Sequence, residues 1–113
     1  MKYKLLLLFI ATLFAFSSCN KDKITLAIVS PENNAVFSKG ELIDVVVTAT
    51  TQKGSIIQVQ LFVDGWEHHS LTDKPYHFTV PTDTLSVGLH FLTAIAHSSE
   101  GVMEGESVDI YIE

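Results

Sequence analysis

The stretch VQLFVDG, residues 59–65, is the part of this 113-residue chain that decides its fold. Aliphatic residues at every second position alternate with a glutamine and a phenylalanine, which is the period of a β-strand with one buried face. Asp64-Gly65 follows directly, and an Asp-Gly pair favours a tight turn that needs positive φ angles. The stretch therefore predicts a strand over 56–63 that ends in a hairpin turn.

Short runs of the same character surround this strand, and Pro, Gly or Asn separate them. No window after Cys19 has the 3.6-residue apolar period of a helix. We therefore expect an all-β domain, a sandwich of about seven strands. The other runs are 24–29, 35–37, 42–50, 66–70, 76–80, 90–96 and, after Gly105, 107–112.

The alternation within these runs also predicts which side chains are buried between the two sheets. On the central strand Ile57 shares the inward phase with its neighbours at 59, 61 and 63. The expected core residues are Val47, Val59, Leu61, Tyr76, Phe78, Leu92, Ala94 and Ile110.

Five motifs occur in order along the domain: IVSPEN at 28–33, GSI at 54–56, VQLFVDG at 59–65, PYHF at 75–78 and GLHFLTAIA at 88–96. With these motifs, residues 24–113 resemble a bacterial immunoglobulin-like domain of the type found in secreted and surface proteins. The resemblance implies a Greek-key sandwich in which the third, sixth and seventh strands lie together, and it implies no chemistry of its own. The chain departs from the family after the turn, where it has Trp66-Glu67-His68-His69.

The first 19 residues have the features of a secretory signal. Lys2 and Lys4 precede an apolar run over 5–16, which is short for a membrane span but typical of a signal peptide. Ser17-Ser18-Cys19 then resembles the cleavage box of a bacterial lipoprotein signal, with phenylalanine in place of the usual leucine before it. The alternative is an ordinary signal peptide with an incidental cysteine.

The lipoprotein resemblance implies that residues 1–18 are removed, that the Cys19 sulfur carries a diacylglycerol, and that the new amine is acylated, with palmitate as the expected chain. Residues 19–23 would then be the lipidated cysteine and a polar tether. Several acyl chains give stable membrane attachment. The tether has no acidic residue directly after Cys19, which favours the outer membrane over the inner membrane and leaves the leaflet open.

Charge argues against some partners. The chain has no Arg and a formal net charge of −6, and after Cys19 five Lys face 13 acidic residues, a formal charge of −8. Nucleic-acid binding is not expected because phosphate contacts need a cationic surface.

Residues that could carry catalysis or bind a metal are scattered. No nucleophile motif frames a Ser, His and Asp set, and Cys19 is the only cysteine. His68 and His69 are adjacent, so a strand would point them to opposite faces, away from a shared ion. His90 is expected to be a corner residue bonded to nearby backbone. We expect no catalytic residue, no metal and no cofactor.

Two features remain as candidate binding surfaces. Trp66 beside the turn could anchor a protein or stack on a sugar, or it could fold back as a lid over the sheet edge. The outward phases of three adjacent strands gather apolar side chains on one sheet face, unless these are scattered or the segment 66–74 covers them. The residues of this candidate face are Phe62, Phe91, Ile95 and Tyr111.

These features predict a non-enzymatic, lipid-anchored envelope protein whose domain binds a protein partner or serves a structural or adhesive role. The alternative is a glycan-binding module that uses the exposed aromatics.

Overall fold

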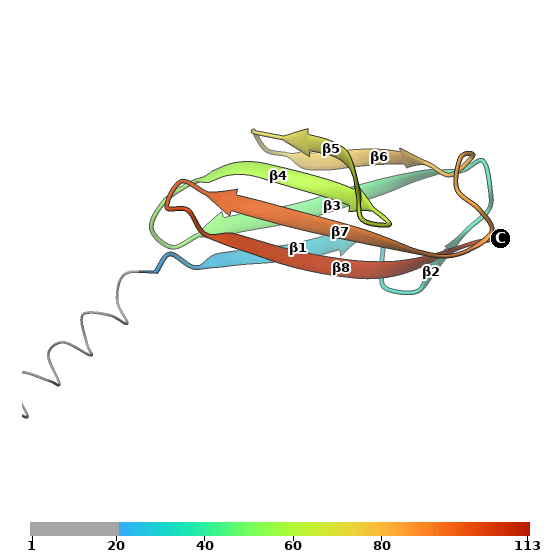
Figure 1. Ribbon diagram of the computed structural model, residues 1–113, viewed down its shortest axis with the longest axis horizontal. Helices are drawn as coiled ribbons and strands as arrows, with labels where there is room; N and C mark the ends of the chain where they lie inside the picture. The colour runs from blue at the N-terminus through green and yellow to red at the C-terminus, as the bar shows by residue number, and fades with distance from the viewer. Residues whose placement is uncertain (1–20) are drawn as a thin grey trace, which may run out of the picture.

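The computed structural model describes residues 21–113, which form two packed β-sheets (Figure 1). This part of the chain has no helix long and apolar enough to cross a membrane. Its strands are β1 (Ile24–Ser30), β2 (Ala35–Phe37), β3 (Leu42–Thr51), β4 (Ile56–Val63), β5 (Trp66–Leu71), β6 (Tyr76–Pro81), β7 (Gly88–Ser98) and β8 (Met103–Ile112).

The sheets have the strand orders β1-β3-β6 and β2-β8-β7-β4-β5. Neighbouring strands are antiparallel except β2 and β8, which are parallel. The chain changes sheet at every connection except those from β4 to β5 and from β7 to β8. This is the Greek-key order of an immunoglobulin-like sandwich. The predicted fold is confirmed, and the predicted third, sixth and seventh strands lie together as β4, β7 and β8.

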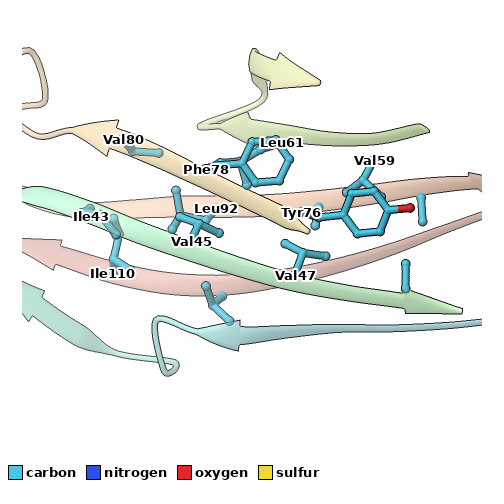
Figure 2. Close-up of a cluster of buried hydrophobic side chains, with 14 of the residues drawn as sticks. Ile43, Val45, Val47, Val59, Leu61, Tyr76, Phe78, Val80, Leu92 and Ile110 are labelled. Atoms are coloured by element: carbon cyan, nitrogen blue, oxygen red, sulfur yellow. The ribbon is translucent and has the colours of Figure 1, made fainter. Parts of the chain in front are cut away.

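The core fills the space between the sheets with aliphatic and aromatic side chains from both layers (Figure 2). All eight residues predicted for the core are buried, and Leu61 and Leu92 are fully inaccessible. Alternation thus assigned the inward face of the long strands correctly, because each strand has one face on the core and one on solvent.

Two predictions about the strands are wrong. Ile57 was expected inside but is 50% exposed, because a β-bulge in β4 gives this strand one more residue than β7 between Ile56 and Gln58. The last strand begins at Met103 and includes Gly105, which pairs with Ile95 instead of preceding the strand.

Asp22 joins the tether region to the end of the sandwich where β1 begins. Its side chain is buried and accepts hydrogen bonds from the backbone N–H groups of Lys23, Lys53 and Gly54 at 2.8, 2.9 and 3.2 Å. Burial raises the pKa of this carboxyl, but these bonds outweigh it and hold the pKa below 3.8. Of the tether predicted over 19–23, residue 22 is thus bound to the β3–β4 turn, while Cys19 lies outside the described residues.

Candidate binding surfaces

The outer face of the five-stranded sheet carries the apolar side chains that the sequence placed there. On β7 the buried His90 and Leu92 point inward, which leaves Phe91 and Ile95 pointing outward. Phe91 is 47% and Tyr111 39% exposed, while Phe62 and Ile95 are half-buried.

The strand register makes these residues neighbours. Phe91 pairs with Asp109, so it lies diagonal to Tyr111 across β7 and β8. Phe62 pairs with Thr93, which places it diagonal to Phe91 on the other side. Diagonal pairs on one sheet face are within reach of aromatic side chains.

Sequence reasoning missed two members of this surface. Leu89 pairs with Tyr111, and Val36 on β2 pairs with the same tyrosine from the opposite side. They are 46% and 57% exposed. Their outward phase was readable, because Leu89 lies two residues before Phe91 and Val36 lies between two half-buried residues. We call Val36, Phe62, Leu89, Phe91, Ile95 and Tyr111 the apolar face.

The rest of the same sheet surface is polar and internally bonded. His97 Nε2 and Gln60 Oε1 are 2.6 Å apart, and Gln60 Nε2 donates to Glu67 Oε1 at 3.2 Å, so one chain of contacts crosses β7, β4 and β5. The segment 66–74 does not lie over the sheet, since β5 pairs in plane with the edge of β4. The apolar face is therefore uncovered by the described chain, with a polar border on one side.

Trp66 is separate from the other candidate residues. It pairs with Val63, whose side chain packs against the core, so Trp66 lies on the side of β5 opposite the apolar face. It is 81% exposed, and it lines a groove of about 270 Å³. A side chain that folded back over the sheet edge as a lid would be more buried than Trp66 is.

His90 has the predicted corner role and a second partner. The ring is buried, its Nε2 donates to the Ser86 carbonyl at 2.6 Å, and its Nδ1 lies 2.6 Å from Asp64 Oδ2. The other carboxylate oxygen accepts the Phe91 N–H at 2.9 Å. His90 therefore connects the β4–β5 turn to the β6–β7 loop.

This geometry favours a protonated imidazole. A carbonyl and a carboxylate both accept, so both ring nitrogens of His90 act as donors. Burial lowers the pKa of His90, but the hydrogen bonds to Asp64 and Ser86 and the charge of Asp64 outweigh it, and the pKa is raised above 6.5.

The two adjacent histidines do not point to opposite faces. β5 has one more residue than β4 between the pairs Leu61–His69 and Phe62–Glu67, and this bulge turns both rings toward β6. His68 Nε2 donates to the Thr79 carbonyl at 2.9 Å, and the His69 ring meets Phe78 edge-on at 6.3 Å. Within residues 21–113, no three His, Cys, Asp or Glu side chains form a metal site.

Residues 25–94 match the family model described as "Bacterial Ig domain". A comparison with curated protein sequences finds no match. Domains of this kind are typically non-catalytic, and the match supports an extracytoplasmic location.

Solved structures with the same fold include the fibronectin(III)-like modules of CbhA from Clostridium thermocellum, with 26% identity and a TM-score of 0.72. The match covers 82% of this chain and 48% of that one, so the chain spans about half the length of that structure. The endo-beta-1,4-mannanase of Thermotoga petrophila is similar at 14% identity and a TM-score of 0.67, over 80% of this chain and 20% of the mannanase. The second likeness concerns the fold alone.

Proposed function

The chain belongs to the bacterial Ig domain family. From that membership, and from the lipoprotein-like signal that ends at Cys19, we propose that it is a lipid-anchored, non-enzymatic protein of the bacterial outer membrane. In this proposal Cys19 carries the lipid and the single immunoglobulin-like domain binds a protein partner. The apolar face of the five-stranded sheet is the binding surface.

The observation that carries the proposal is the exposure of the apolar face. A sheet face that only contacts water presents polar side chains, as the part of this sheet around Gln60 and His97 does. Phe91, Leu89, Tyr111 and Val36 instead form a contiguous exposed row on three strands. Contiguous apolar patches on a soluble domain mark partner surfaces, and aromatics are enriched at the centres of interfaces.

The shape of this face favours a protein over a glycan. Aliphatic Val36 and Leu89 flank Tyr111 on both sides, so the surface offers a broad apolar contact. A sugar needs an aromatic ring beside several polar groups that bond its hydroxyls. The apolar face therefore supports a protein-binding role.

The contacts of Asp22 support a fixed orientation of the domain relative to its anchor. Because the side chain of residue 22 is bound to the β3–β4 turn, only residues 20 and 21 separate Cys19 from the folded part. The β3–β4 and β7–β8 turns lie at the end where β1 begins, and the C-terminus and the β6–β7 loop lie at the other (Figure 1). An anchor at Cys19 would hold the first end at the membrane and the second away from it.

The test compares two variants that each remove one exposed apolar side chain. Phe91→Ser changes the apolar face, and Leu42→Ser changes β3, where Leu42 is 64% exposed in the other sheet. After mild cross-linking in cells, the tagged wild type and Leu42→Ser should copurify the same envelope protein, and Phe91→Ser should lose it. Equal recovery with Phe91→Ser and wild type would contradict the proposal, provided both variants keep the wild-type circular dichroism spectrum.

A further inference from the structure

The groove beside Trp66 is a second surface with a chemistry different from that of the apolar face. It lies where the β4–β5 hairpin approaches the end of β6 and the β6–β7 loop, and its volume is about 270 Å³. Val63, Val80 and Leu85 contribute apolar surface, and Trp66 adds an exposed aromatic ring. His68 and Thr84 add polar groups, whereas the Glu67 carboxylate lies on the other side of β5, where it accepts a hydrogen bond from Gln60.

The two walls of this groove are held in a fixed relation. Asp64 and Gly65 have φ angles of 52° and 84° and form the two-residue turn that presents Trp66. His90 bonds this turn through Asp64 and the β6–β7 loop through Ser86. A site held before its ligand arrives loses little entropy on binding.

The start of the β6–β7 loop is also held in place by hydrogen bonds. Thr82 is fully buried, and its hydroxyl donates to the Glu41 carbonyl at 2.6 Å and accepts the Gly40 N–H at 2.8 Å. The Leu85 N–H donates to the Thr82 carbonyl at 3.1 Å. Leu85 and Thr84 are therefore positioned by contacts that do not depend on a ligand.

The polar groups of the groove are a mixed set of donors and acceptors. Both Asp64 oxygens already accept hydrogen bonds, one from the His90 ring and one from the Phe91 N–H. His68 Nε2 donates to the Thr79 carbonyl, which leaves Nδ1 as the ring atom that can bond a ligand. Thr84 adds a hydroxyl that can donate or accept.

We propose that this groove binds a neutral saccharide. The apolar face of a pyranose ring stacks on Trp66, and its hydroxyls bond to His68 and Thr84. The domain's formal charge of −8 after Cys19 disfavours acidic sugars and phosphates. A cationic ligand is disfavoured because both Asp64 oxygens already accept hydrogen bonds, the Glu67 carboxylate lies on the other side of β5, and Trp66 is the single indole ring available for cation–π contact.

The test uses the fact that Trp66 is the only tryptophan of the chain. The soluble domain, residues 21–113, would be titrated with cellohexaose, mannohexaose and maltohexaose, with oligogalacturonate and trilysine as charged probes. At least one neutral hexaose should shift the Trp66 emission to shorter wavelength in a saturable way, without dependence on salt. The charged probes should not.

Variants assign the effect to the groove, with binding measured by calorimetry because Trp66→Ala removes the fluorophore. Trp66→Ala should weaken binding by about tenfold or more, as loss of a central aromatic contact does. Thr84→Val, which keeps the side-chain shape, should weaken it by about threefold. Phe91→Ser should leave saccharide binding unchanged, so this result is independent of the protein-binding role of the apolar face.

Three results would overturn the proposal. The first is the absence of any Trp66 response to the neutral hexaoses up to about 10 mM, beyond which binding has little free energy. The second is equal affinity in Trp66→Ala and wild type. The third is a salt-sensitive response of the Trp66 emission to trilysine alone, because that would identify a cation site.

Discussion

His90 connects several parts of this domain through one buried ring. It has the inward phase of β7, yet its two nitrogens bond Ser86 on one side and Asp64 on the other. Its family-typical corner role was predicted from its position at the start of the strand. The bond to Asp64 was not predicted, because Asp64 and His90 are 26 positions apart and come together only through the pairing of β4 with β7.

The raised pKa of His90 predicts a pH dependence of stability. A raised pKa means that the folded state binds the proton more tightly, so this contribution is complete below pH 6.5 and is lost as the pH rises through the folded-state pKa. Urea unfolding of the wild type between pH 6 and 9 should therefore show a free energy of unfolding that falls with pH. Asp64→Asn and His90→Gln should both reduce that fall.

The control for this prediction is His77→Gln, which removes an exposed histidine on β6. It should keep the wild-type pH dependence. If the free energy of unfolding falls with pH equally in His90→Gln, His77→Gln and the wild type, the contacts of His90 with Asp64 and Ser86 do not raise its pKa.

At the scale of elements, the Asp64-Gly65 turn determines where β5 and Trp66 lie. Gly65 has a φ of 84°, and a Cβ at this position would have no atom within 4 Å. A substitution there would therefore cause backbone strain but no steric clash. Gly65→Ala should lower the free energy of unfolding by about 1–2 kcal/mol, the cost of a left-handed conformation for an L-residue. Thermal or urea unfolding would measure it.

Gly105 is the matched control for this turn. It lies within β8 without a positive φ, and a Cβ there would be 3.8 Å from the Ala94 carbonyl oxygen, an ordinary contact. Gly105→Ala should change stability by no more than about 0.5 kcal/mol. A loss as large as that of Gly65→Ala would show that the cost does not come from φ.

The elements also show why sequence predicted some features and not others. Strict alternation identified the inner faces of β3, β6 and β7 because nothing interrupts their pleat. Ile57 and the pair His68-His69 were misplaced because each lies at a bulge, where one extra residue reverses the phase that follows. A bulge depends on pairing with a partner strand, which local sequence does not contain.

The apolar face was partly predictable for the same reason. Once the order of three strands was expected from the family resemblance, phase alone placed Phe62, Phe91, Ile95 and Tyr111 on one surface. Val36 was missed because its strand pairs in parallel with β8, so its neighbour comes from a distant segment. The groove at Trp66 was not predictable, since its walls come from opposite sheets.

At the scale of the whole molecule, the anchor and the domain make one prediction together. Cys19→Ala should abolish palmitate labelling and release the protein from the membrane fraction, because attachment depends on the acyl chains. Metabolic labelling followed by fractionation measures both. A Cys19→Ala variant that remains in the membrane fraction, with no acyl label in either form, would contradict the lipoprotein proposal.

The most direct test of the central proposal, a protein partner on the apolar face, is site-specific photo-cross-linking in intact cells. A photoreactive phenylalanine analogue would replace Phe91 on the apolar face or Thr48, an exposed residue of β3 in the other sheet. We predict one discrete adduct of higher mass from position 91 and none from position 48. No adduct from position 91, or the same adducts from both positions, would contradict a partner on this face.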